Sequence, residues 1–306
     1  MKNDQLKTPV LFLVFNRPDI TRLVFEKIRQ AKPKQLFIAA DGPRSDCKDD
    51  IENCSQVRDI FSEIDWPCES KMLLREKNLG CKIGVSSAIS WFFKNAEEGI
   101  ILEDDCLPSQ SFFWFCQELL QRYRHNKDIM HISGFNHFSQ TLVNEAGYHF
   151  TKYTSVWGWA TWKSAWEFYT VELKSFPDVK KTNVIKNMFT IRSEQKFRIK
   201  IFEKIYNNLI NTWDYQWNYA IRLNNGICIR PNVSLIQNVG FSKNATHTNK
   251  KNFQLESVKA FNIDYPLAQS EPISINEEID RKFYFTFIKP SLFTKLKNKL
   301  KNLLIK

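Results

Sequence analysis

The chain has 306 residues, of which 43% are hydrophobic and 14% aromatic, so it can bury a large core, and disorder of most of its length is excluded. Its seven cysteines are an odd number without a Cys-X-X-Cys pair, which argues against a disulfide framework or a zinc site and favours a reducing compartment. The net charge of +11 is compatible with nucleic acid, an anionic membrane or phosphorylated substrates as partners. No apolar run approaches the roughly 18 residues of a membrane span, and no signal peptide pattern is present, so we expect a cytoplasmic protein.

The first half of the chain alternates short apolar strands with helical patterns. The expected strands cover residues 10–15, 36–40, 71–74 and 100–102, and the expected helices cover residues 20–31, 50–64, 84–96 and 109–124. This repetition predicts an α/β fold with a mainly parallel, Rossmann-like sheet flanked by helices on both faces. The second half is less regular, with expected strands at residues 129–133 and 226–230 and expected helices at residues 193–210 and 214–224.

Three consecutive carboxylates, Glu103, Asp104 and Asp105, follow the apolar strand that ends at Leu102. Ligands of open α/β sheets bind just outside the carboxyl ends of the strands. Adjacent like charges repel, so we expect a hard divalent cation that carries a phosphorylated substrate to compensate them. The alternative is an acidic loop that binds no ligand.

Two other strands of this half also end in polar residues. The first is followed by Asn16 and Arg17, and the second by Asp41 and Gly42. Arg17 can pair with a phosphate, and Asp41 can accept hydrogen bonds from a base or ribose; the alternatives are a surface charge and a turn residue. Neither a GxGxxG nor a Walker motif is present, so we expect a metal ion and basic side chains to hold any phosphates.

Taken in order, these segments resemble the nucleotide-sugar glycosyltransferases of the GT-A fold, in particular N-acetylglucosaminyltransferase I and related bacterial sugar transferases. The similar segments are LFLVFNRPDITRLVFEKI (11–28), FIAADGP (37–43), NLGCKIGVSSAISWFF (78–93), ILEDDCLPSQSFFWF (101–115), TWDYQWNYAIR (212–222) and CIRPNVSLIQNVGFSKNATHT (228–248).

This resemblance implies an inverting, metal-dependent transferase that moves a sugar from a UDP-sugar donor to a glycan or lipid-linked saccharide acceptor in surface polysaccharide biosynthesis. Its cofactor would be Mn²⁺ or Mg²⁺. The donor-binding half would cover residues 1–134, the acceptor-side and catalytic half residues 135–270, and a C-terminal extension residues 271–306.

The resemblance also implies roles for individual residues. Asp105 would bind the metal directly, with His247 as a second candidate ligand that is otherwise an exposed loop histidine. Asp214 would be the general base, unless its carboxylate caps the helix that begins there. The expected nucleotide-sugar contacts are Asn16, Arg17, Asp41, Lys82, Glu103, Asp104, Trp157 and Trp159; for the tryptophans the alternative is ordinary core packing.

Residues 289–306 carry six lysines and no acid, with leucines at helical spacing. This basic amphipathic pattern predicts a helix that lies on the anionic inner face of the cell membrane, or one that docks on the protein's own core.

Two other functions remain open. One is a nucleotidyltransferase that makes a nucleotide sugar, although such enzymes usually open with a Gly-rich basic loop that LFLVFNRPD lacks. The other is a nucleic-acid-binding protein, although the basic residues concentrate in the tail and no binding motif is present, so we expect no nucleic acid partner.

Overall fold

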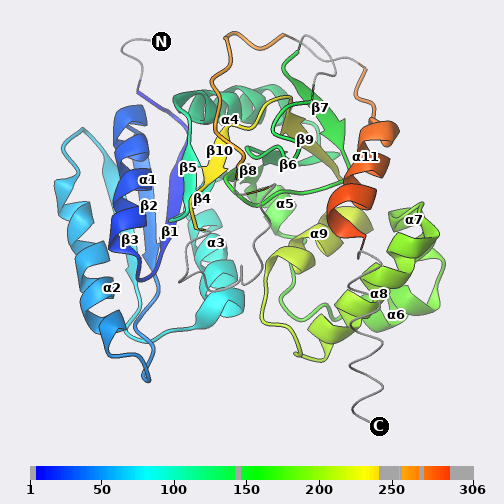
Figure 1. Cartoon of the computed structure of the whole chain (residues 1–306), viewed down its shortest axis with the longest axis horizontal. Helices are drawn as coiled ribbons and strands as arrows, with labels where there is room; N and C mark the ends of the chain where they lie inside the picture. Colours follow the sequence, from blue (N-terminus) through cyan, green and yellow to red (C-terminus); the bar gives the residue numbers. More distant parts are fainter. Residues whose placement is uncertain (1–4, 142–145, 241–254, 256, 269–271, 290–306) are drawn as a thin grey trace.

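A central eight-stranded sheet organises the protein, with the strand order β3-β2-β1-β4-β8-β6-β9-β7 (Figure 1). The computed structural model describes residues 5–141, 146–240, 255, 257–268 and 272–289. In sheet order the strands are β3 (Glu69–Leu74), β2 (Gln35–Ala40), β1 (Val10–Val14), β4 (Glu98–Glu103), β8 (Trp159–Trp162), β6 (Ile129–Ser133), β9 (Ile227–Pro231) and β7 (Tyr148–Thr151).

Most of this sheet is parallel, as the sequence predicts. Strands β3, β2, β1 and β4 run in one direction, and β6 and β9 share it because both β4 and β6 pair antiparallel with β8. Strands β8 and β7 run the opposite way. Neither was expected, since all four residues of each are buried and the period-two alternation that marks a half-exposed strand is missing.

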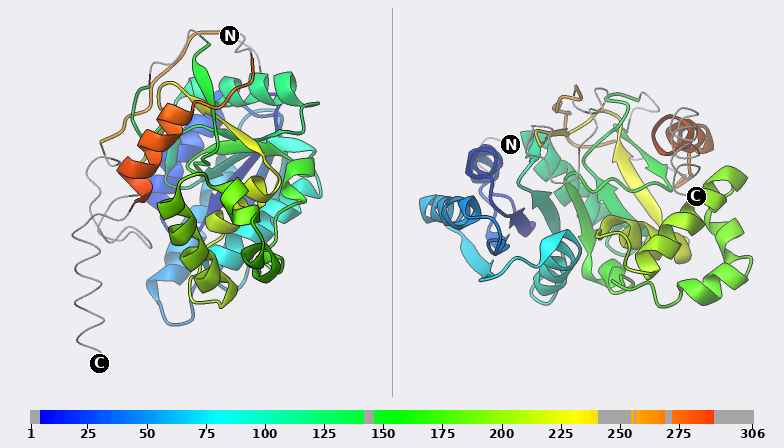
Figure 2. Two further views of the ribbon diagram at one scale, coloured as in Figure 1. Left: turned by 90° about the vertical axis from the view of Figure 1, so that its right-hand side faces the viewer. Right: turned by 60° about the horizontal axis from the view of Figure 1, so that its bottom comes forward.

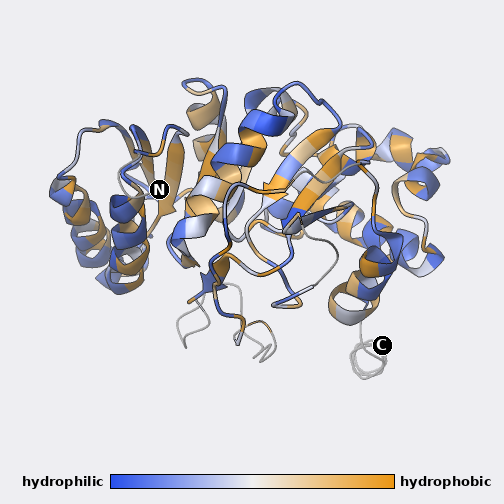
Figure 3. Ribbon diagram, turned by 90° about the horizontal axis from the view of Figure 1, so that it is seen from above, coloured by the Kyte–Doolittle hydropathy of each residue, from blue (hydrophilic) through white to orange (hydrophobic). Residues whose placement is uncertain are grey.

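Helices cover both faces of the sheet because the strands are apolar on both sides. Phe12 of β1 packs toward α1 (Pro18–Ala31), α2 (Asp49–Asp59) and α4 (Gln110–Tyr123). Leu11 and Leu13, which point the other way, pack with α3 (Ser86–Phe93) and α9 (Asp214–Leu223). In the right-hand view of Figure 2, α3 (cyan) lies across the strands from α1 (dark blue), and Figure 3 colours most of the central strands as hydrophobic.

Irregular helical turns complete several of the expected helices. The helix expected at 50–64 ends as a short 3₁₀ segment, Ile60–Glu63, and the helix expected at 84–96 begins as a π-helical turn, Cys81–Val85. The expected helix at 193–210 is α8 (Arg192–Tyr206).

A group of helices packs beside the main sheet around a core of its own. It contains α6 (Phe176–Lys181), α7 (Val184–Met188) and α8, and Tyr219 of α9 joins the same core. Two further helices are α5 (Lys163–Trp166) and α11 (Glu277–Phe283), the latter followed by a π-helical turn, Tyr284–Ile288. The division into residues 1–134, 135–270 and 271–306 stays a prediction.

A second, two-stranded sheet lies directly after the acidic residues. Strand β5 (Cys106–Pro108) pairs antiparallel with β10 (Ile236–Asn238). No helix within the described ranges is both long and apolar enough to cross a membrane. The basic helix expected near the C-terminus falls almost entirely on residues 290–306, outside the described part of the chain.

Candidate functional site

The ends of three neighbouring parallel strands meet at one edge of the sheet. Val14 of β1 lies beside Ala40 of β2, and Leu13 of β1 lies beside Glu103 of β4. Strand β1 separates β2 from β4, so the chain leaves β1 toward one side and returns on the other, which is the switch point where α/β sheets bind ligands. A cleft of about 410 Å³ opens there. Its lining includes the predicted site residues Arg17, Asp41, Glu103, Asp104, Asp105 and Trp157.

The cation that pairs with the acidic cluster is Arg17, which lies between β1 and α1. Arg17 donates through Nε to Asp104 Oδ2 at 3.1 Å and through Nη2 to Asp104 Oδ1, and Nη2 also lies 3.1 Å from Asp105 Oδ2. The guanidinium that the sequence assigned to a phosphate therefore orients two carboxylates in this structure. Two parallel bonds from one guanidinium fix a carboxylate more firmly than one bond does.

The cleft still carries more negative charge than Arg17 neutralises. Burial, followed by the charges of Asp105 and Asp104, raises the pKa of Glu103 well above its usual range. Burial also raises the pKa of Asp104 to about 6, although the paired Arg17 lowers it. Carboxylates respond in this way when they are desolvated beside like charges.

The residues of this edge fit a metal ion only if substrate completes its coordination. Among the described residues, no group of three His, Cys, Asp or Glu side chains is placed to hold a metal. Arg17 pairs with both oxygens of Asp104 but with only one oxygen of Asp105, and the Asp105 side chain is the more exposed of the two, at 20% against 7%. Magnesium is commonly held by one or two carboxylates together with substrate phosphates, and Asp105 suits that mode. His247 lies outside the described residues.

The backbone of the chain after β10 packs directly against Asp105. The Val239 N–H donates to the Asp105 carbonyl oxygen at 2.8 Å. A Cβ placed on Gly240 would overlap Asp105 Oδ2, so a larger residue there would displace the carboxylate. The segment after β10 therefore fixes both the backbone and the side chain of Asp105, the candidate metal ligand.

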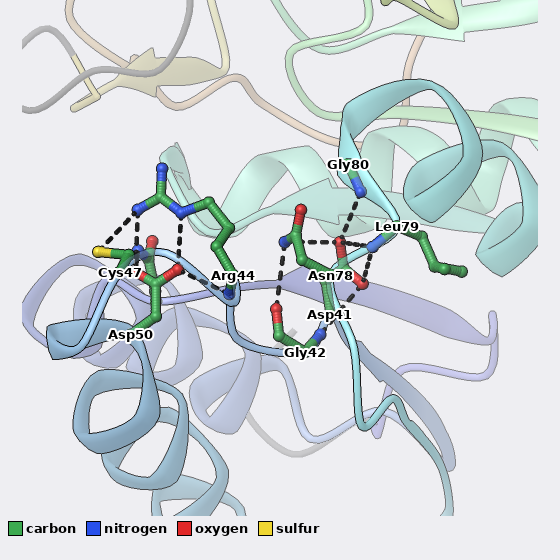
Figure 4. Close-up of polar contacts among 9 residues, drawn as sticks. Asp41, Gly42, Arg44, Cys47, Asp50, Asn78, Leu79 and Gly80 are labelled. Atoms are coloured by element: carbon green, nitrogen blue, oxygen red, sulfur yellow. Dashed lines mark hydrogen bonds and ion pairs between the residues drawn. The ribbon is translucent and has the colours of Figure 1, made fainter.

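Asp41 holds a loop in place instead of presenting free oxygens. Its carboxylate accepts the N–H groups of Leu79 and Gly80 at 3.0 and 3.1 Å, the side-chain amide of Asn78 at 3.1 Å, and the Gly42 N–H at 3.1 Å (Figure 4). The sequence assigned this carboxylate to a nucleobase or ribose, but both of its oxygens already have partners. Its placement instead gives the loop at 78–80 a fixed position on the cleft.

Arg75, which the sequence analysis did not name, is a second cation of the cleft. Its Nη1 donates to the Gly84 carbonyl at 3.0 Å and its Nη2 to Ser87 Oγ at 2.7 Å. It lines the cleft, and no ion pair involves it among the described residues. Arg75 follows β3 directly, as Arg17 and Asp41 follow β1 and β2 closely. The presence of a polar residue just after a predicted strand could therefore have identified Arg75 from the sequence.

Asn16 and Arg44 belong to a separate network at the rim. The Asn16 amide donates to Asp50 Oδ1 at 2.7 Å. Arg44 Nε donates to Asp50 Oδ2, also at 2.7 Å, as Figure 4 shows. The hydrogen bond from Arg44 holds the pKa of Asp50 well below its usual range. Asn16 therefore supports the cleft wall through Asp50 and is not part of the cavity lining.

The structure brings only one of the two expected tryptophans to the cleft. Trp157 lines it, whereas Trp159 is fully buried and stacks on Trp213 at 5.8 Å and on His131 at 5.1 Å. The expectation that both form a sugar-binding wall is thus corrected for Trp159, which is a core residue.

Lys82 and Asp214 also lie outside the cavity lining. Lys82 Nζ donates to Asn208 Oδ1 at 2.9 Å, so this side chain is directed toward the end of α8. Asp214 is the first residue of α9 and accepts a hydrogen bond from Thr212 Oγ1. It makes no capping hydrogen bond, because the cap position is Trp213.

Comparison with known proteins finds similar solved structures, of which two are described below. No family model and no curated protein matches the chain. The structure titled UDP-glucose pyrophosphorylase complexed with UDP-glucose has a TM-score of 0.38 at 11% identity, covering 74% of this chain and 90% of that one. The 4-diphosphocytidyl-2C-methyl-D-erythritol synthase of Anaerococcus prevotii has a TM-score of 0.30 at 7% identity, covering 66% and 84%.

This comparison contradicts the expected inverting glycosyltransferase. Neither of these solved structures is titled a glycosyltransferase. Since both TM-scores lie below 0.5, the function proposed below is argued from the geometry of the cleft.

Proposed function

We propose that the cleft binds a nucleotide together with a divalent cation, and that the protein is a nucleotidyltransferase that joins a nucleotide to a sugar phosphate. The observation that carries this proposal is the meeting of the acidic cluster, Arg17 and Arg75 at the switch point of the sheet. The volume of about 410 Å³ lies within the range of small-molecule sites.

In this proposal, Asp105 would hold Mn²⁺ or Mg²⁺, and the ion would supply Lewis-acid polarisation of the phosphates and charge compensation for the leaving group. Arg17 holds the carboxylates of Asp104 and Asp105 in fixed orientations. Glu103, whose pKa is raised by burial, adds a carboxyl group behind them that stays protonated to higher pH than usual.

Side chains, and not a glycine-rich loop, would hold the phosphates. The N–H groups of Leu79 and Gly80 already donate to Asp41, so they do not form an anion-binding loop. Arg75 is the cation in the cleft lining without an ion pair among the described residues, and a phosphate would supply its missing counter-charge.

The proposed reaction needs no general base. An oxygen of the sugar phosphate attacks the α-phosphorus of a nucleoside triphosphate, the bond from that phosphorus to the bridging oxygen breaks, and pyrophosphate leaves. The attacking phosphate is already ionised at neutral pH, whereas a sugar hydroxyl needs a base. The position of Asp214 outside the cavity lining supports this assignment.

The test is to incubate the full chain with each nucleoside triphosphate and a set of hexose 1-phosphates, with Mn²⁺, with Mg²⁺ or with EDTA. We expect metal-dependent pyrophosphate and nucleotide sugar in a ratio of one to one. Release of free sugar and nucleoside diphosphate from a nucleotide sugar, without pyrophosphate chemistry, would overturn nucleotidyl transfer but keep the nucleotide site. Absence of any nucleotide binding would overturn both.

We also infer from the sequence that residues 289–306 attach the protein to anionic membrane surfaces, as a basic amphipathic segment can. The full chain should sediment with vesicles containing phosphatidylserine, and a chain ending at residue 288 should not. Equal sedimentation of the two would refute this inference.

A further inference from the structure

A second cavity of about 460 Å³ is lined by residues of α7, α8, α9 and α11. Figure 1 shows α7, α8 and α11 on the far side of the sheet from β3. It shares no lining residue with the nucleotide cleft. We call it the helical cavity and define it by Tyr153, Met188, Glu194, Arg222, Asp280 and Arg281, which line it.

The helical cavity contains a buried guanidinium with unused hydrogen-bond donors. Arg222 is 7% exposed, and its Nη1 donates to the Met188 carbonyl at 2.9 Å. Its Nε and Nη2 have no hydrogen-bond partner. The group lies 4.7 Å from the ring of Tyr153 and 4.8 Å from that of Phe189, so aromatic rings fix its plane. Nε and Nη2 form one edge of the guanidinium, which is a geometry that binds carboxylate or phosphate through two parallel bonds.

The buried carboxylates nearby are already engaged. Glu194 pairs through Oε1 with Arg198 Nε at 3.2 Å and accepts the Tyr153 hydroxyl at Oε2 at 2.6 Å. Asp280 accepts from Thr151 Oγ1 and from the Lys152 N–H at 2.8 Å. Arg222 forms no ion pair with either of them among the described residues.

The balance of buried charges also favours a negatively charged ligand. The buried charged residues of this region are Arg222, Glu194 and Asp280, which line the cavity, and Arg198 and Arg230, which do not line it. Among these five buried groups one positive charge is in excess, and the less buried lining residues Lys152 and Arg281 balance Glu277 and Glu278. Burial lowers the pKa of Arg222, which is the response of a desolvated cation without a sufficient counter-charge. A buried charge that lacks a partner is costly, so a negatively charged ligand would stabilise this arrangement.

We propose that the helical cavity binds a small hydroxylated organic anion, such as a sugar phosphate or a sugar acid, whose anionic group pairs with Nε and Nη2 of Arg222. Lys152 and Arg281 at the wall add positive charge. Glu277 and Glu278, also in the lining, accept hydrogen bonds from ligand hydroxyls and disfavour anions that carry several charges. This proposal does not depend on the function of the nucleotide cleft.

The test measures calorimetric binding and thermal stabilisation of the full chain with glucose 6-phosphate, glucuronate and inorganic phosphate, with neutral glucose as the ligand control. We expect saturable binding of at least one organic anion and none of glucose. Arg222→Met should weaken that binding at least tenfold. The matched control is Arg75→Gln in the nucleotide cleft, which should retain it.

A second variant keeps the test decisive if Arg222→Met fails to fold. Thr190 is an exposed residue of the cavity lining, so Thr190→Trp should block entry and weaken binding at least tenfold without altering a buried charge. Failure of all three anions to bind would overturn the proposal. A loss of binding in Arg75→Gln that equals the loss in Arg222→Met would also overturn it, because the anion would then occupy the nucleotide cleft.

Discussion

The charges that line the nucleotide cleft and the buried charges around the helical cavity are unbalanced in opposite directions. In the cleft lining, the four carboxylates of Asp41, Glu103, Asp104 and Asp105 outnumber the arginines. In the helical cavity, Arg222 has no carboxylate of its own. The comparison teaches that the imbalance, more than the residue type, indicates what each cavity can bind: the cleft favours a cation with its substrate, and the helical cavity favours an anion.

The largest expected effect is on the free energy of unfolding, and it should differ between Arg198 and Arg222. Arg198→Met should lower the free energy of unfolding by about 3–5 kcal/mol, because it leaves the buried Glu194 without its ion pair. Arg222→Met should lower it far less, or raise it, because no ion pair is lost. Denaturant unfolding of both variants measures the difference, and equal losses would show that Arg222 is not in excess.

Removal of the accessible carboxylate in the cleft should have the next largest effect. We expect Asp105→Asn to reduce metal-dependent turnover or nucleotide binding by about 100-fold or more, since a direct ligand is lost. Asp49→Asn, an exposed residue at the start of α2, is the matched control and should behave as wild type. Unchanged metal dependence in Asp105→Asn would remove Asp105 from the metal site.

The burial of Asp104 in the cleft should appear as a pH dependence of stability. The pKa of Asp104 is raised to about 6, so the folded protein binds this proton more tightly than the unfolded chain does. Its contribution to stability is therefore present below about pH 4 and is lost as the pH rises through about 6, a change of roughly 3 kcal/mol. The stability of wild type minus that of Asp104→Asn, followed by unfolding from pH 4 to 7, should fall; a rise would contradict the raised pKa of Asp104.

The smallest expected effect concerns Arg75. Arg75→Gln keeps hydrogen-bond donors but removes the charge, so nucleoside diphosphate binding should weaken by roughly tenfold, about 1.4 kcal/mol. Leu74, its neighbour on the exposed side of β3, provides a control as Leu74→Gln. Calorimetric titration measures both variants, and equal affinities would exclude a phosphate contact at Arg75.

The sequence predicts the parallel half of this fold well because each strand there is a short apolar run followed by a polar residue. The same pattern places Arg17, Asp41 and Glu103 at a single edge, as the structure shows. It does not reveal that Arg17 pairs with Asp104, or that Asp41 fastens the loop at 78–80, because both contacts join segments far apart in the chain.

Trp159 shows why the rest was harder to predict. Trp157 and Trp159 flank Gly158 symmetrically in the sequence, but Gly158 adopts a φ of 62°, which turns the chain so that one ring reaches the cleft and the other the core. The functional expectation failed for a different reason: motifs at a nucleotide-binding edge identify where a ligand binds, and several reactions can be carried out on the same type of edge.

The pairing of β5 with β10 makes chain length, as well as residue type, a constraint on the site. Asn238 lies opposite Cys106, the residue after Asp105, and a Cβ at Gly240 would overlap that carboxylate. A shift of one residue in this ladder would turn every side chain to the other face and move Gly240 away from Asp105. Single-residue insertions or deletions between Ile236 and Gly240 should therefore be less tolerated than most substitutions there.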